Sequence, residues 1–184
     1  TTLVVVTVYK RGAAEVVRSA NALANVCGAV CPEEIYCQPV CSRSKEDRPI
    51  EIRGLHFFAT QEEARGGFTP LVKLPRRAGS VAVIGGGPAG LGCAFELVKY
   101  GYRVTLYDPN GVGGVPRATI PAFRLGEREL HDDLSFLSTF VTVKHEQVTP
   151  AKFAALRKHH DAVFLGFGLG KDRPLGLPGE LAYL

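Results

Sequence analysis

The sequence contains no methionine, no tryptophan and no long hydrophobic run. Its longest strongly apolar stretch, residues 3–8, is far shorter than the roughly 20 residues that a membrane-spanning helix needs. The same stretch lacks the basic flank and the small-residue cleavage site of a signal peptide. We therefore expect no membrane span and a cytoplasmic location. Because no initiator methionine is present, we also expect a chain that lost its start or is a piece of a longer one.

A strong charge of either sign is missing as well. The 22 basic and 18 acidic side chains leave a formal net charge of only +4, spread over both halves of the chain. So weak and dispersed a charge argues against a nucleic-acid partner. The hydrophobic fraction of 46% with 22% charged residues is typical of a globular protein. The 21 glycines fit tight cofactor-binding turns.

Four of the five cysteines lie close together, at Cys27, Cys31, Cys37 and Cys41. Disulfides are disfavoured because no export signal accompanies them. Structural zinc is a second alternative, but these spacings are not the two-residue knuckle typical of zinc ribbons. Iron–sulfur ligation is favoured because thiolates on short, proline-containing loops can surround a cluster. Cys93 lies within an apolar helical pattern and is predicted to be a buried thiol rather than a ligand.

A helix is predicted just upstream of the cysteines, over residues 12–25. The helix would have one apolar face and would lead directly into the cysteine loop. The residues expected on that face are Ala13, Val16, Val17, Ala20 and Ala24.

A dinucleotide-binding fingerprint begins at a predicted buried strand, residues 80–84. Gly85 permits the tight turn, Gly87 lets the backbone approach a pyrophosphate, and Gly90 lets helix and strand pack closely. A helix over residues 91–100 follows, and its N–H groups would face the phosphates.

An acidic residue stands where such a fold needs one. The strand predicted over residues 103–107 ends in Asp108, which follows Gly90 by 18 residues. A carboxylate at this position accepts hydrogen bonds from ribose hydroxyls. A second glycine-rich turn over residues 111–115 suits another close backbone approach.

The remaining pattern alternates helices with strands. A helix is expected over residues 126–138, another opens at Thr149-Pro150, and a strand follows at residues 162–165. His159-His160 fit a helix C-terminus better than a metal pair. The alternation predicts a parallel α/β sheet with right-handed crossovers.

The chain resembles the iron–sulfur and FAD electron-input module shared by the glutamate synthase small subunit and the N-terminal part of dihydropyrimidine dehydrogenase. The matching blocks are residues 21–23, 26–32 with Cys37 and Cys41, 49–55, 81–92, 113–114 and 120–125. The resemblance runs from about residue 9 to residue 180. It implies a helical iron–sulfur domain over residues 1–72. A partial Rossmann-like FAD-binding domain with a parallel sheet would follow over residues 78–184, incomplete at its C-terminus.

For the metal, the resemblance implies that Cys31, Cys37 and Cys41 ligate two [4Fe–4S] clusters, with Cys41 serving a different cluster from the other two. Cys27 is expected not to be a ligand. His56 falls where the dihydropyrimidine dehydrogenase branch supplies a non-cysteine ligand, and histidine can fill that role. A packed helix histidine is the alternative for His56.

For the nucleotide, the resemblance implies FAD. Pyrophosphate contacts would come from the turn and the first helical residues, the ribose contact from Asp108, and a further flavin contact from Arg124. Val148 falls where the family adds a backbone contact to the adenine. The expected cofactor-binding residues are Gly85, Gly87, Pro88, Ala89, Gly90, Leu91, Asp108, Gly113, Gly114, Val115, Arg124 and Val148.

The family also has upstream cysteines that complete both clusters, and a later domain that binds NAD(P)H. Neither is in this sequence, so we expect a fragment or a split subunit that needs partner domains or a partner subunit. The predicted function is that of an NAD(P)H-dependent flavoprotein oxidoreductase passing electrons from FAD to iron–sulfur clusters and on to a partner. Two alternatives remain open: a non-catalytic assembly module, and a zinc-stabilised NAD-binding regulator.

Overall fold

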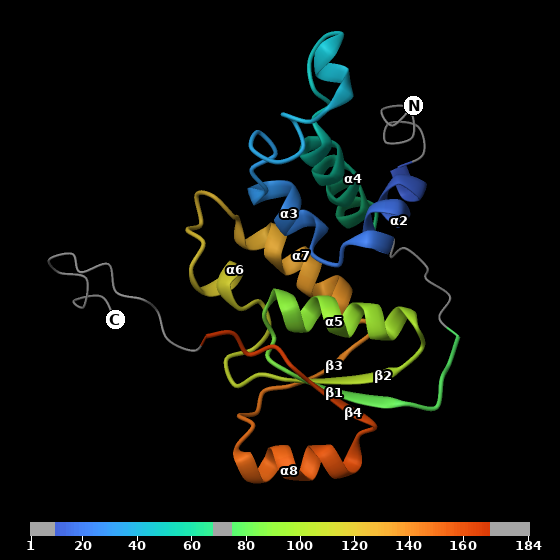
Figure 1. Ribbon diagram of the computed structural model, residues 1–184, viewed down its shortest axis with the longest axis vertical. Coiled ribbons are helices and arrows are strands. Elements are labelled where there is room, and N and C mark those ends of the chain that lie inside the picture. The colour runs from blue at the N-terminus through green and yellow to red at the C-terminus, as the bar shows by residue number, and fades with distance from the viewer. Residues whose placement is uncertain (1–9, 68–74, 170–184) are drawn as a thin grey trace, which may run out of the picture.

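The computed structural model describes residues 10–67 and 75–169 (Figure 1). In chain order the helices and strands are α2 (Lys10–Ala20), α3 (Ala24–Val30), the 3-10 helix η1 (Ser42–Lys45), α4 (Ile52–Gly66), β1 (Ser80–Ile84), α5 (Pro88–Lys99), β2 (Arg103–Tyr107), α6 (Val115–Ala118), α7 (Glu127–Ser138), β3 (Thr142–Lys144), α8 (Pro150–His159) and β4 (Ala162–Leu165).

The strands form one four-stranded sheet in the order β3-β2-β1-β4, and every neighbouring pair is parallel. The central strand β1 is apolar and almost wholly buried, whereas the edge strands β3 and β4 are partly exposed. This order follows from burial, because a central parallel strand is covered on both faces and therefore reads as a continuous apolar run. The expected α/β class with a parallel sheet is confirmed.

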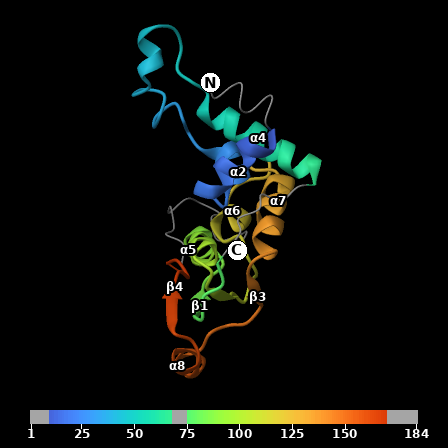
Figure 2. The ribbon, with the colours of Figure 1, turned by 90° about the vertical axis from the view of Figure 1, so that its right-hand side faces the viewer.

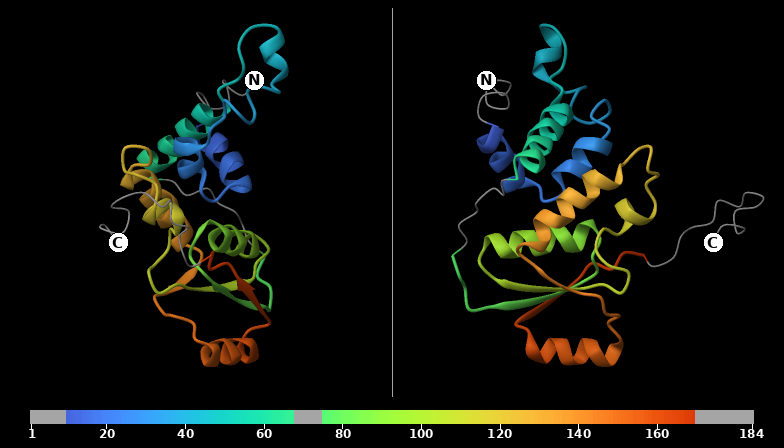
Figure 3. Two further views of the ribbon diagram at one scale, coloured as in Figure 1. Left: turned by 60° about the vertical axis from the view of Figure 1, so that its left-hand side comes forward. Right: turned by 180° about the vertical axis from the view of Figure 1, so that it is seen from behind.

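The elements stack in layers (Figure 2). Helices α5 and α7 lie on one side of the sheet, and α8 lies on the other. The helical part made by α2, α3 and α4 stands beyond α7, which α3 contacts. The segment carrying residues 31–50 extends away from the sheet in each view (Figure 3).

The main hydrophobic core joins the helical part to the sheet. It combines Leu23 and Val26 from the helical part with Val83 and Leu106 from the sheet and Phe136 from α7. A second cluster packs α2 against α4, and a third packs the far face of the sheet against α8. The helical part therefore rests on the sheet domain through a shared apolar interface.

The helix predicted over residues 12–25 is broken into two. Helix α2 ends at Ala20 and α3 begins at Ala24, because the Asn21 side-chain oxygen accepts the Leu23 N–H at 2.9 Å. Such an Asx turn competes with helix continuation. The predicted face was also wrong at Val16, which is 68% exposed, and at Ala20, which is exposed.

A buried charge network crosses the interface between the helical part and α7. Arg18 of α2 donates from Nε to Glu63 of α4 at 2.7 Å and from Nη1 to Asp133 of α7 at 2.6 Å. Asp133 also accepts the N–H groups of Asn25 and Val26 at the start of α3, at 3.2 and 2.9 Å. Sequence patterns gave no sign of this network. Through this network, all three helices of the helical part are bonded to α7, which packs on the sheet.

The other predicted elements are confirmed within a residue or so, apart from α5, which begins three residues earlier than expected. Thr149 caps α8 as expected, accepting the Lys152 N–H at 3.3 Å, and His159 ends that helix. Strand β3 was not predicted, because three residues give no readable period. The apolar stretch at residues 3–8 lies outside the described residues. Among the helices described, none has the length and apolarity needed to span a bilayer.

Candidate nucleotide and iron–sulfur sites

The first glycine turn runs from β1 into α5 at the carboxyl end of the sheet. Gly85 has φ +107°, a left-handed conformation that favours glycine, and Gly87 is the N-cap of α5 without any side-chain cap. A Cβ on Gly90 would collide with the Gly85 carbonyl oxygen. The turn therefore needs glycine at both ends. It leaves the first N–H groups of α5 free of side-chain caps, as an anion site requires.

The second glycine turn lies directly against the first. The Gly113 N–H donates to the Gly86 carbonyl oxygen at 2.8 Å, and a Cβ on Gly114 would lie 2.6 Å from Gly87 Cα. Both Gly113 and Gly114 have positive φ. Two separate glycine segments thus meet in front of the α5 N-terminus, where a Cβ on Gly87 would meet only Gly114 Cα, at 3.8 Å.

Asp108 follows β2 and faces the first turn. Its Oδ2 accepts the Gly86 N–H at 2.7 Å, and its Oδ1 accepts the Asn110 N–H at 2.9 Å. These bonds fix the carboxylate at the carboxyl edge of the sheet, and each oxygen keeps a lone pair for a further donor. Gly86 therefore orients both Asp108 and the second turn, a role that the spacing of the fingerprint did not reveal.

The remaining nucleotide residues occupy different surroundings. Val115 begins α6 and is 61% exposed, next to the second turn. Val148 packs beside the cluster of Tyr107 and Leu156 on the α8 side of the sheet. Arg124 is exposed on the segment between α6 and α7. The structure thus brings the glycines and Asp108 together. It leaves Val148 and Arg124 without a direct contact to the turns among the hydrogen bonds of the described residues.

These features fit a dinucleotide. Backbone at both glycine turns is bare of side chains, a helix N-terminus faces the gap, and a carboxylate stands at the end of the neighbouring strand. A third glycine segment supports the turn from below, since a Cβ on Gly85 would collide with the Gly166 backbone. The two glycine turns and Asp108 are therefore compatible with a dinucleotide such as FAD in both shape and chemistry, whereas the roles expected for Val148 and Arg124 stay predictions.

The cysteine segment begins where α3 ends. Cys31 is the C-cap of α3, and its N–H donates to the Cys27 carbonyl at 3.0 Å. The pKa of the Cys31 thiol is raised, first by burial and then by the neighbouring Cys27, Cys37 and Glu33. The raised pKa keeps the metal-free thiol protonated, so ligation of iron by Cys31 would have to release that proton. Cys27 itself is exposed.

Cys41 has a different environment. Backbone hydrogen bonds from Ile50, then Arg43 and Ser44, lower the pKa of its thiol below the ordinary value. Donors aimed at a sulfur stabilise the thiolate, which is the form that ligates iron. Cys41 thus fits the chemistry of a cluster ligand.

The proposed ligands do not form a complete metal site among the described residues. Across residues 10–67 and 75–169, no group of three or more His, Cys, Asp or Glu side chains could hold a metal ion. His56 is exposed on α4. Cys93 is half-buried in α5, and burial raises the pKa of its thiol, which agrees with the expected structural role. The thiol chemistry fits iron–sulfur ligation, with further ligands needed from outside the described part.

One hydrogen bond joins the two candidate sites. Arg124 donates from Nη2 to the Val30 carbonyl oxygen at 3.2 Å, at the residue just before Cys31. The side chain expected at the flavin thus contacts the end of the helix that carries the first predicted ligand.

Comparisons with known proteins find a similar protein family for each of the two segments that carry these sites. The family model for dihydropyrimidine dehydrogenase domain II, which carries a 4Fe-4S cluster, matches residues 5–67. The family model for FAD dependent oxidoreductases matches residues 80–136. The chain is 37% identical over 172 residues to the NAD-dependent dihydropyrimidine dehydrogenase subunit PreT of Escherichia coli (strain K12), covering 91% of this chain and 41% of that protein.

A second relative is the NADPH-Fe(3+) oxidoreductase subunit beta of Geobacter sulfurreducens (strain DL-1 / KN400). It is 32% identical over 173 residues, covering 90% of this chain and 25% of that protein. The chain thus spans less than half of the length of each relative, 41% of the first and 25% of the second. The matches confirm the resemblance that the motifs indicated: the chain is similar first to the 4Fe-4S domain of dihydropyrimidine dehydrogenase and then to FAD dependent oxidoreductases.

Proposed function

We propose that this chain is the electron-input portion of an NAD(P)H-dependent oxidoreductase. In this proposal the chain holds FAD at its glycine turns and contributes Cys31, Cys37, Cys41 and His56 to [4Fe–4S] clusters. Partner domains or a partner subunit supply the NAD(P)H site, the remaining cluster ligands and the terminal acceptor. Two relatives whose names describe NAD- or NADPH-dependent subunits support this assignment.

When bound, FAD converts two-electron hydride chemistry into the single-electron steps that iron–sulfur clusters accept. The chain itself supplies binding and orientation. The α5 N-terminus and the two glycine turns would hold the pyrophosphate, and Asp108 would accept the ribose hydroxyls. No general acid or base is needed among these residues.

The observation that carries the proposal is the hydrogen bond from Arg124 to the Val30 carbonyl. This bond connects the segment expected to contact the flavin to the end of α3, directly before Cys31. The flavin and the cluster held by Cys31 would therefore lie near each other in the protein. The shared hydrophobic core supports the same arrangement, because Val26 of α3 and Leu125 both belong to it. Electron transfer between cofactors depends on such a fixed separation.

The proposal is tested by reconstituting the chain, purified together with the partner domains or subunit that complete its clusters, with FAD, iron and sulfide under anaerobic conditions. We expect bound flavin together with iron, seen in the visible spectrum and by metal analysis. Asp108→Ala should lower flavin content while leaving iron, Cys41→Ser should lower iron while leaving flavin, and Cys93→Ser should change neither. A chain that binds no flavin after reconstitution contradicts the proposal.

Two other results identify the alternatives. Protein that folds but retains neither flavin nor iron is an assembly module that has kept the fold. Zinc without iron, together with nucleotide binding, indicates a zinc-stabilised regulator.

A further inference from the structure

The face of the sheet that meets α8 is only half covered. Alternate residues of a strand share one face, so Ser80, Arg103 and Thr105 lie on the same face as Ile84 and Tyr107. Helix α8 packs on the carboxyl half of this face through Leu156, which joins the cluster of Ile84 and Tyr107. The amino half of the face remains uncovered by α8.

The uncovered half is polar, which is unusual for its position. Parallel sheets are normally buried on both faces under apolar side chains. Here the register places Thr105 opposite Thr142 and Ser80 opposite Arg103. Hydroxyl and guanidinium groups therefore occupy sites where the fold normally has aliphatic residues.

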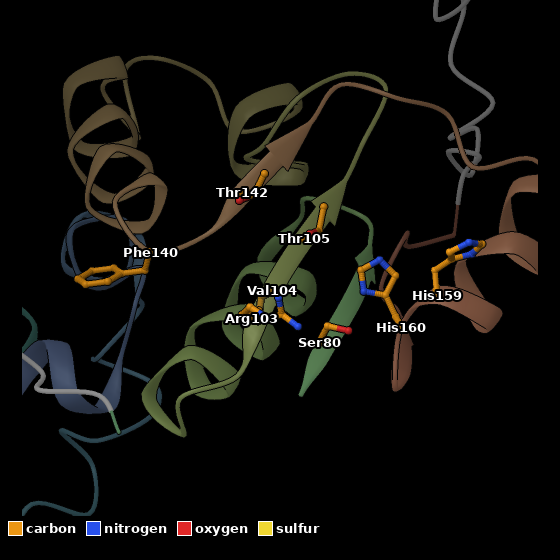
Figure 4. Close-up of a pocket in the computed structure, with 8 residues that line it drawn as sticks. All are labelled: Ser80, Arg103, Val104, Thr105, Phe140, Thr142, His159 and His160. Atoms are coloured by element: carbon orange, nitrogen blue, oxygen red, sulfur yellow. The ribbon is translucent and has the colours of Figure 1, made fainter. Parts of the chain in front are cut away.

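A cavity of about 440 Å³ opens over this half (Figure 4). The sheet contributes its floor, and the end of α8 contributes His159 and His160. In the close-up, the His160 ring, the Arg103 side chain and the Ser80 hydroxyl approach one another, with Thr105 above them. The cavity lies at the strand beginnings, so it is at the opposite end of the sheet from the glycine turns.

The charge of the cavity is predominantly basic. Arg103 is exposed, and among the described residues it takes part in no ion pair. The acidic residue nearby is Asp161, whose Oδ2 already accepts the Ser80 N–H at 2.7 Å and its hydroxyl at 3.2 Å. The Nδ1 atom of His160 is buried and has no hydrogen-bond partner.

The pKa of His160 shows the effect of these positive charges. It is lowered first by burial and then by the positive groups His159 of α8, Lys144 of β3 and Arg103 of β2, while Asp161 opposes them. A bound anion would offset those positive charges and raise the pKa of His160.

From this geometry we propose that the cavity at the amino end of β1, β2 and β3 binds a phosphate group, with Arg103 as its charged donor and the His160 ring as a further donor. The Thr105 and Thr142 hydroxyls supply neutral donors from the floor. Guanidinium groups match the geometry of phosphate oxygens, and such charge-assisted bonds are about twice as strong as neutral ones. The site is independent of the proposed flavin and cluster chemistry.

The histidines provide a local test. Inorganic phosphate is titrated into the isotope-labelled chain at constant pH and ionic strength, and the imidazole resonances of its five histidines are followed by NMR. We expect saturable shifts for His159 and His160, and an increase in the pKa of His160. The other three histidines, His56, His131 and His145, do not line the cavity and serve as internal references.

Variants separate binding from fold. Arg103→Gln should weaken phosphate binding about tenfold or more, because one charge-assisted contact is lost. Arg128→Gln on α7, away from the cavity, is the matched control and should bind as the unchanged chain does. Comparison with adenosine monophosphate distinguishes the sources of the group: tighter binding indicates a phosphate ester, and equal binding indicates the free anion.

Two results would overturn the proposal. One is the absence of saturation at His159 and His160 in a chain whose other resonances show it to be folded. The other is unchanged affinity in a folded Arg103→Gln variant, since the anion would then be held elsewhere.

Discussion

Asp133 holds the helical part against the sheet domain, and its removal should destabilise both together. Its carboxylate is fully buried and bonds to Arg18 and to two N–H groups of α3. In Asp133→Ala, Arg18 retains Glu63 as its one carboxylate partner, and the N–H groups of Asn25 and Val26 lose their acceptor. A buried charge and two buried donors would then be incompletely paired.

The expected loss follows from those partners. Breaking a buried ion pair by removing one member costs about 3–5 kcal/mol. The orphaned N–H groups lie within the same network, so their cost is part of this figure rather than an addition to it. Domains of this kind are stable by about 5–15 kcal/mol, so the loss is a large fraction of the total. Asp133→Asn keeps one acceptor oxygen and should lose less.

Urea unfolding followed by circular dichroism measures the change. With a slope of about 2 kcal/mol per molar urea, a loss of about 4 kcal/mol lowers the midpoint by about 2 M. Glu127→Ala is the matched control, because it removes an exposed carboxylate from the same helix. A surface carboxylate contributes little, so this variant should change stability by less than about 1 kcal/mol. Equal, small losses in both variants would refute the reasoning.

Three further predictions concern single groups. Gly90→Ala should abolish FAD binding or folding, because its Cβ would collide with the Gly85 carbonyl; a folded variant with normal flavin content would contradict this. In the metal-free chain, iodoacetamide should modify Cys41 faster than Cys93 near neutral pH, since hydrogen bonds from Ile50, Arg43 and Ser44 lower the first thiol pKa and burial raises the second; mass spectrometry of timed digests gives both rates, and the reverse order refutes the assignment. Burial raises the pKa of Glu63 above its ordinary 4.5, so the folded state binds that proton more tightly and this contribution to stability falls as pH rises from 4.5 through the folded pKa. Glu63→Gln should flatten this part of the stability profile in urea melts at several pH values.

Local patterns were sufficient for the nucleotide half. Residues 80–108 contain, in order, a strand, the glycine turn, a helix and a second strand that ends in an acidic residue. Each of these features acts through backbone conformation or a short-range contact. Such features depend on residue type and spacing, so they are visible before folding. The cysteine segment was readable for the same reason, as thiol chemistry belongs to the residue itself. The ligand set remains a prediction.

Other features required the tertiary structure. The break at Asn21 depends on one side-chain hydrogen bond that the helical period does not register. The contact between the two glycine turns brings Gly86 and Gly113 together across a crossover. The half-open sheet face depends on where α8 comes to rest, which no strand pattern states.

The sequence by itself determined the chemical groups of this protein: the glycine turns, the acidic strand end, the thiols and the alternation of helices and strands. Only the tertiary structure decided which groups meet. Arg18 and Asp133 are 115 residues apart along the chain, yet they form a buried pair that joins the two halves. The physical reason is that propensity and periodicity act over a few residues, whereas burial and charge pairing depend on segments that only packing brings together.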